Sequence, residues 1–129
     1  MTKKSVIITV LCLILFIGSA VNGATISGTD LNLVSSGVSG TMDIMLDQAP
    51  SGIAGYQLEI SINPGSNAEI ISVNFPASFS MNSASKLPSS SVNIVAVDLV
   101  DQIKSGASNI ILATLGIKGL TDGEADVQV

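Results

Sequence analysis

Apolar and polar residues alternate one by one along several short stretches of the chain, and this alternation constrains the fold most. In residues 56–62, Tyr, Leu, Ile and Ile take every second position, with Gln, Glu and Ser between them. A period of two is typical of a β-strand that buries one face. Turn-forming residues separate such stretches, as in Gln48–Gly52 and Asn63–Gly65, because Gly permits positive φ and Pro cannot donate to a strand ladder.

The remaining elements follow the same pattern, and no stretch has the longer period of an extended helix. Residues 78–91 hold seven serines and are expected to form a loop, whereas residues 98–105 are expected to form one helical turn. Short strands with frequent turns predict an all-β fold, a two-sheet antiparallel sandwich. The expected strands lie at residues 41–46, 56–62, 70–73, 92–97, 109–118 and 124–129.

The first 23 residues differ from the rest and have the layout of a secretory signal peptide. Lys3 and Lys4 precede an apolar run from residue 6 to residue 17, and small residues follow it. This run is shorter than the roughly 20 residues that a membrane-spanning helix needs. We therefore expect a signal helix in residues 1–23, cleaved after Gly23, and a secreted or cell-surface domain in residues 24–129. A retained membrane anchor is the alternative, and it would be the chain's one link to a membrane.

The composition argues against several classes of function. The chain has no His and no Arg, and Cys12, its one cysteine, lies in the signal segment. An activated serine nucleophile, a multi-thiolate zinc site and a phosphate clamp therefore lack their usual residues. The exported part has three Lys against ten acidic residues, and this balance disfavours nucleic acid as a partner. We expect no catalytic residues and no cofactor, so the protein is not expected to be an enzyme.

The acidic residues are another possible source of chemistry. Asp98 and Asp101 are three residues apart, and a pair of carboxylates can act in hydrolysis. We favour a simpler interpretation in which Asp98 caps the short turn and Asp101 is solvated. Calcium binding among Asp47, Asp98, Asp101 and Asp122 is not expected, since none has the spacing of a calcium-binding loop. No metal site is therefore predicted.

Several segments resemble cohesin domains. The run Gly52–Pro64 resembles the third strand of this family, with a Gly-Ile turn, an alternating strand and a closing Asn-Pro. The flanking segments resemble the family in the same order along the chain, and together they extend from about Thr25 to Val129. These segments are Gly40–Leu46, Ala68–Phe75, Ala96–Asp98, Asn109–Gly119 and Thr121–Ala125.

The resemblance implies a nine-stranded, jelly-roll-like sandwich that is secreted and does not catalyse. Cohesins bind dockerin domains and thereby assemble polysaccharide-degrading complexes, so a dockerin-type domain is the implied partner. The chain ends within an alternating stretch at Val129. We therefore expect the domain to lack the family's last strand and to be a fragment.

The resemblance also implies where a partner docks, because cohesins use a sheet face that includes the third and sixth strands. In residues 109–118 we expect Ile111, Ala113, Leu115 and Ile117 to face the core. That expectation turns Ile110 and Leu112 outward, beside Gln57 and Glu59, as the candidate partner-binding face. In the alternative interpretation, Gln57 and Glu59 are simply solvated, and the serine-rich loop covers the two apolar residues.

Two other functions remain open from the sequence. The first is a carbohydrate-binding module on the same kind of sandwich, but sugar platforms need exposed planar rings and the chain has no Trp. Tyr56 is expected to point inward, and Phe75 and Phe79 lie in a loop region. The second is a passive structural domain of a surface protein, without a specific ligand.

Overall fold

The protein is an all-β sandwich, as the sequence predicts. The computed structural model describes residues 6–11, 25–29, 31–33, 36–122 and 124–129. Its strands in chain order are β1 (Val6–Leu11), β2 (Ile26–Gly28), β3 (Leu31–Leu33), β4 (Ser39–Ala49), β5 (Gly55–Asn63), β6 (Ala68–Asn74), β7 (Met81–Ala84), β8 (Ser91–Val97), β9 (Ala107–Gly119) and β10 (Glu124–Gln128).

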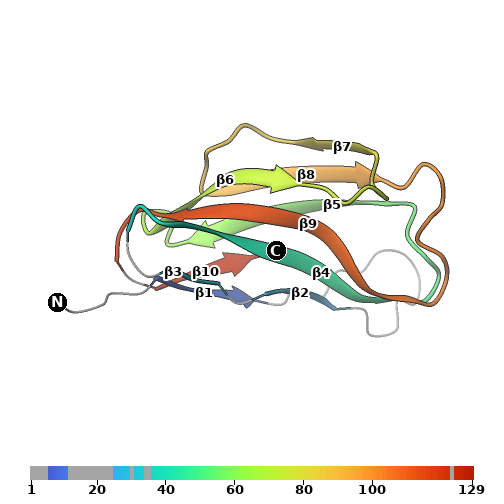
Figure 1. Ribbon diagram of the computed structural model, residues 1–129, viewed down its shortest axis with the longest axis horizontal. Helices are drawn as coiled ribbons and strands as arrows, with labels where there is room; N and C mark the ends of the chain where they lie inside the picture. Colours follow the sequence, from blue (N-terminus) through green and yellow to red (C-terminus); the bar gives the residue numbers. More distant parts are fainter. Residues whose placement is uncertain (1–5, 12–24, 30, 34–35, 123) are drawn as a thin grey trace.

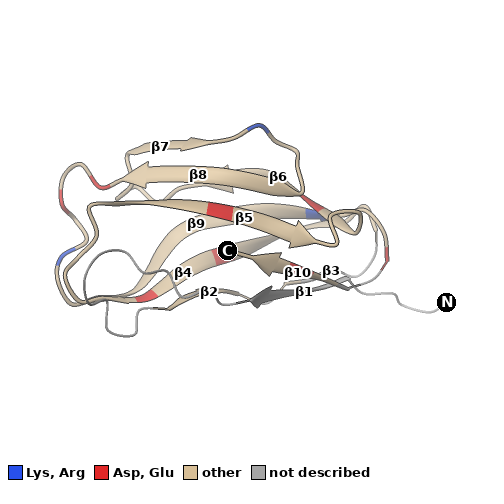
Figure 2. Ribbon diagram, turned by 180° about the vertical axis from the view of Figure 1, so that it is seen from behind, with Lys and Arg blue, Asp and Glu red and all other residues tan. Residues whose placement is uncertain are grey.

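Two antiparallel sets of four strands, one from each sheet, make up the core of the sandwich. The first sheet has the strand order β10-β5-β8-β7, and the second has the order β2-β4-β9-β6. Beyond β10, the first sheet continues with β1 and then β3. Figure 1 views the second sheet in front, and Figure 2, turned by 180°, brings β5 and β8 of the first sheet to the front.

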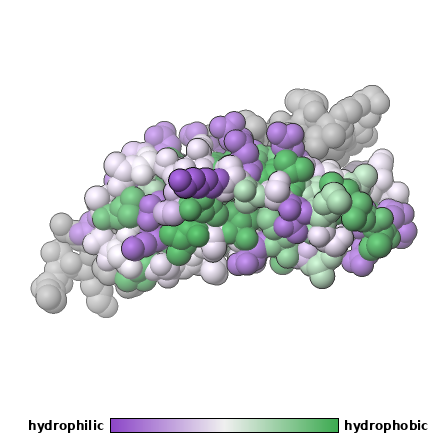
Figure 3. All heavy atoms as spheres, turned by 90° about the horizontal axis from the view of Figure 1, so that it is seen from above, coloured by the Kyte–Doolittle hydropathy of each residue, from purple (hydrophilic) through white to green (hydrophobic). Residues whose placement is uncertain are grey.

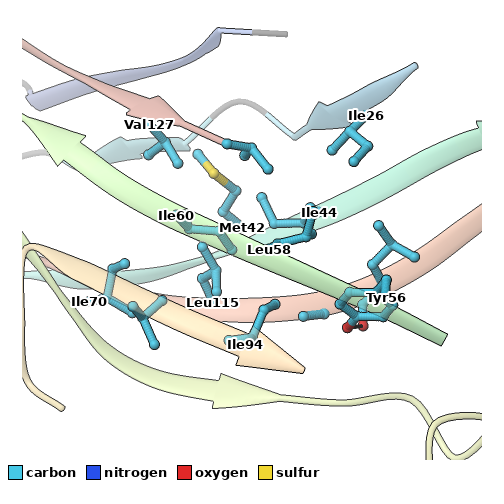
Figure 4. Close-up of a cluster of buried hydrophobic side chains, with 14 of the residues drawn as sticks. Ile26, Met42, Ile44, Tyr56, Leu58, Ile60, Ile70, Ile94, Leu115 and Val127 are labelled. Atoms are coloured by element: carbon cyan, nitrogen blue, oxygen red, sulfur yellow. Dashed lines mark hydrogen bonds between the residues drawn. The ribbon is translucent and has the colours of Figure 1, made fainter. Parts of the chain in front are cut away.

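The inner faces of the two sheets form one apolar core between them (Figure 4). In β5, the alternation seen in the sequence is confirmed, since all four apolar side chains of residues 56–62 are buried. The ring of Phe79 packs edge-on against that of Tyr56, with centroids 5.0 Å apart and an interplanar angle of 88°. The largest fully buried side chains are Phe79, Met42, Ile44, Ile60, Ile70, Ile94, Leu112, Leu115 and Ile117.

A hydrogen bond joins the two sheets inside this core. The Tyr56 hydroxyl, carried by β5 of the first sheet, donates to the backbone carbonyl of Leu112 on β9 of the second sheet. Both residues are buried, so the bond satisfies two polar groups that have little access to water. Burial raises the pKa of Tyr56, because the charged phenolate is poorly solvated there.

An irregularity in the second sheet changes which side of β9 faces the core. The register of β4 against β9 shifts between Ile44, which pairs with Ala113, and Met45, which pairs with Ile111. Leu112 therefore has no partner residue on β4 and is an extra residue on β9. Such a bulge places two consecutive residues on the same side and reverses the alternation beyond it. Leu112 and Ala113 are accordingly both buried, whereas Ile111 is 39% exposed.

Two expected elements differ from the structure. Residues 78–91 are not wholly a loop, because they contain β7, a short edge strand that pairs with β8. Residues 98–105 contain no helix. Instead, backbone hydrogen bonds join this segment to the β4–β5 turn, from the Gly106 N–H to the Ala49 carbonyl at 2.9 Å and from the Ile53 N–H to the Ile103 carbonyl at 3.3 Å.

The expected signal helix is wrong for the six residues of that segment that form β1. These residues, Val6–Leu11, are extended and pair with both β10 and β3. Five of the six are β-branched, and β-branched side chains favour strands over helices. The rest of the 1–23 segment lies outside the described residues, so its cleavage after Gly23 stays a prediction. No helix among the described residues is long and apolar enough to cross a membrane.

Candidate functional site

The outer face of β5 and β8 is the candidate site. These two strands pair antiparallel over seven positions, with Gln57 opposite Val95 and Glu59 opposite Asn93. All four of these side chains are exposed, while the alternate positions of both strands are buried. The face therefore presents two rows of side chains on a regular, continuous ladder.

The edge strand β7 widens this face. Met81 pairs with Val97, and Ser83 pairs with Val95, so the rows continue across three strands. Met81 is 57% exposed and Val95 is 39% exposed, which gives the face an apolar part among polar neighbours. Glu59 is the one charged residue in β5, β7 and β8 together, and Figure 2 shows this acidic position among uncharged strand residues.

The loop after β8 adds two more apolar side chains at one end of the face. Leu99 and Val100 are 58% and 64% exposed. The loop runs along the end of the molecule at the right of Figure 1, and Figure 3, seen from above, shows apolar atoms at the surface of that end. Two apolar side chains of the loop that follows β8 are therefore exposed as well.

Asp98 holds this loop in place. It is 5% exposed, and its Oδ2 accepts a hydrogen bond from the Ile103 backbone N–H at 2.7 Å. Its own N–H donates to the Ala54 carbonyl at 2.9 Å. Hydrogen bonds from the backbone of Gln102 and Ile103 lower the pKa of Asp98, because they stabilise the carboxylate. Asp98 thus caps a turn, as expected, although the turn is not helical.

The structure separates the four residues that were expected to form the partner-binding face. Gln57 and Glu59 are exposed on the first sheet, as expected. Ile110 and Leu112 lie on β9 of the second sheet and are 9% and 2% exposed. The expectation that these two face outward beside Gln57 and Glu59 is therefore wrong. The bulge at Leu112 reverses the alternation that the sequence alone indicates, so Ile111 takes the outward position.

The structure adds Asn93, Val95 and Met81 to this face, and the sequence analysis does not single out any of the three. The sequence predicts a strand at residues 92–97, but the place of this strand beside β5 depends on pairing between distant segments. Met81 lies in the serine-rich stretch that was expected to be a loop. Counting the strands that follow residues 56–62 could have identified residues 92–97 as the sixth strand. That count fails from sequence alone because β7 lies in the stretch that is predicted to be a loop.

The two candidate catalytic carboxylates have separate structural partners. Asp98 binds backbone N–H groups, whereas Asp101 forms an exposed ion pair with Lys104 at 2.7 Å. Among the described residues, no group of three or more His, Cys, Asp or Glu could hold a metal ion.

Comparison of the chain with models of protein families, with curated proteins and with solved structures finds no match.

Proposed function

We propose that the chain is an exported, non-catalytic binding module that docks a protein partner on the outer face of β5, β8 and β7. The observation that carries this proposal is the composition of that face, with one charged residue, Glu59, and with Met81 and Val95 exposed among polar side chains. The centres of protein interfaces are depleted in charge and enriched in such apolar anchors. An exposed apolar patch with a polar rim commonly marks a partner site.

The cohesin resemblance supports the same face. With β5 taken as the third strand, β6, β7 and β8 are the fourth, fifth and sixth. The third and sixth strands are then direct neighbours in the first sheet, where the resemblance implies partner docking. We therefore propose that the docking surface consists of Gln57, Glu59, Asn93 and Val95 and does not include the buried Ile110 and Leu112.

This proposal includes a cohesin-like, jelly-roll-like fold, secretion or display at the cell surface, and a dockerin-type partner in a polysaccharide-degrading assembly. A carbohydrate-binding module is less well supported, because Tyr56 and Phe79 are 8% and 1% exposed and their rings cannot form a sugar platform. Retention of the protein on an insoluble polysaccharide would nevertheless revive that alternative. A passive structural domain would bind neither ligand.

The decisive experiment compares two matched variants. Val95 and Ile111 are both outward-facing strand residues that are 39% exposed, but they lie on opposite sheets. Binding of the full chain to a dockerin-type domain from the same source is measured by isothermal titration calorimetry. Because a buried charge at an interface centre is costly, Val95→Asp should weaken binding at least about tenfold. Ile111→Asp should leave the affinity unchanged.

Thermal unfolding of both variants controls for damage to the fold. Equal affinities for Val95→Asp and the unmodified chain would contradict the proposed face. Loss of binding with Ile111→Asp alone would move the docking surface to the second sheet. Absence of binding to any dockerin-type domain from the same source would contradict the proposed partner.

A further inference from the structure

Strand β1 lies between two other strands of the first sheet. It pairs in parallel with β10 over five positions, from Ile7 opposite Glu124 to Leu11 opposite Gln128. On its other side it pairs antiparallel with β3 over three positions, from Val6 opposite Leu33 to Ile8 opposite Leu31. No other described strand joins β3 to β10, so β1 is an internal strand whose backbone bridges its two neighbours.

Export would remove this internal strand. The inference rests on the part of the proposed function in which residues 1–23 are cleaved as a signal, since β1 lies within them. Neighbouring strands are about 4.8 Å apart, so loss of β1 leaves a slot about 10 Å wide between β3 and β10. Both sides of the slot then present backbone N–H and C=O groups without partners, and such edges readily accept another strand.

We propose that this slot, between Leu31–Leu33 and Glu124–Gln128, accepts an extended strand from a partner protein once residues 1–23 are removed. Addition of a strand to a sheet is a general mode of peptide recognition, in which backbone hydrogen bonds supply the affinity. The slot lies on the side of β10 that faces away from β5, whereas the docking face lies on β5, β8 and β7. The slot therefore gives the protein a second contact with its surroundings.

The strand that now occupies the slot indicates the chemistry of the partner segment. β1 is uncharged and almost wholly β-branched, with the sequence VIITVL, and runs parallel to β10. Thr9 pairs with Asp126, whose side chain is exposed, so the partner residue at that position should be neutral or basic. A second copy of the chain is disfavoured as the donor, because each exported copy carries ten acidic residues against three Lys.

The experiment uses protein secreted by cells that express the full chain, with its mass measured to locate the cleavage. The probe is a synthetic peptide with the sequence of residues 4–12, in which Cys12→Ser prevents oxidation. Hydrogen exchange of the backbone amides is followed with and without the peptide. We expect exchange at residues 124–128 and 31–33 to slow at least about tenfold, because the peptide restores both ladders. A peptide with Thr9→Pro has a proline at the position that pairs with Asp126, in the middle of the β10 ladder, and should protect residues 124–128 much less.

Three results would overturn the slot. In the first, the peptide does not change the exchange rate of the amides at 124–128. In the second, these amides already exchange slowly without the peptide because β3 pairs directly with β10. In the third, they exchange slowly without the peptide because the protein forms a dimer. If the secreted protein retains residues 1–23, the cleavage in the proposed function fails, and the slot is tested in the full chain. There, Thr9→Pro should free the slot, and the peptide should restore slow exchange. Fast exchange despite the peptide would contradict the inference.

Discussion

The hydrogen bond between the two sheets can be removed with little change to the packing around it. In Tyr56→Phe the ring keeps its edge-on contact with Phe79 at 5.0 Å, and the buried carbonyl of Leu112 loses the hydroxyl that donates to it. An unsatisfied buried acceptor costs about 1–3 kcal/mol. With a typical denaturant dependence, the urea midpoint should fall by about 1 M. Far-UV circular dichroism is the suitable probe, since the variant lacks the chain's one tyrosine.

The pH dependence of stability gives the same substitution a second readout. Burial raises the pKa of Tyr56 in the folded state, so the unfolded chain releases its phenolic proton first as the pH rises. The stability that this group contributes is thus fully present below about pH 10, the ordinary tyrosine pKa, and is lost as the pH rises toward the folded-state pKa. The Tyr56→Phe variant has no phenol to ionise, so its unfolding free energy does not fall in this way as the pH rises. The unfolding free energies of the two proteins should therefore converge above about pH 10.

Two outcomes would refute this reasoning. A Tyr56→Phe variant as stable as the unmodified protein at neutral pH would show that the bond between the sheets contributes nothing. Titration of the phenol in the folded protein at the ordinary tyrosine pKa, followed by its ultraviolet absorbance, would show that Tyr56 is not buried. Because the chain has one tyrosine, the absorbance change reports this residue alone.

Five further substitutions, in three experiments, test the bulge, a turn and the loop. Leu112→Ala should cost about 2–5 kcal/mol of unfolding free energy, because the side chain is 2% exposed, while Ile111→Ala should cost about 1 kcal/mol or less; equal losses would contradict the bulge. Gly52→Ala should destabilise more than Gly37→Ala in urea unfolding. Both residues have positive φ, but only the Cβ added at position 52 would meet a backbone oxygen, that of Ile103 at 2.7 Å. Asp98→Asn should speed hydrogen exchange at the Ile103 amide, which donates to the carboxylate. It should also remove a contribution to the unfolding free energy that is present above about pH 4 and is lost as the pH falls through the lowered folded-state pKa of Asp98. Unchanged exchange in Asp98→Asn would show that the carboxylate does not hold the loop.

Local alternation predicts much of this fold because one buried face leaves a simple record in a strand. Residues 56–62 show this directly, since each alternate position has the burial that the sequence indicates. The same is true of Ala113, Leu115 and Ile117 on β9. In these stretches the strand remains regular, so the side of each residue follows from its position alone.

Prediction fails where pairing between distant strands decides the outcome. The bulge at Leu112 arises from the register of β4 against β9, and no local pattern in residues 109–118 reveals it. One extra residue was enough to turn Ile110 and Leu112 inward and Ile111 outward. The predicted binding face was wrong at these positions because it assumed a regular strand.

Tertiary contacts also override composition in the serine-rich segment. Residues 78–91 have the composition of a loop, but β8 offers an edge with which Met81–Ala84 can pair. Just before this strand, Phe79 is 1% exposed because its ring packs on Tyr56. The sequence alone did not show that these neighbours were within reach.

Nuclear magnetic resonance mapping of the bound state tests the proposed docking most directly. A dockerin-type domain is titrated into the isotopically labelled full chain, and the shifts of the backbone amides are recorded. The proposal predicts that the largest changes cluster at Gln57, Glu59, Asn93 and Val95, with smaller changes at Met81 and little change around Met45 and Ile111. Changes centred on the outer face of β4 and β9, or none at saturating partner, would contradict it.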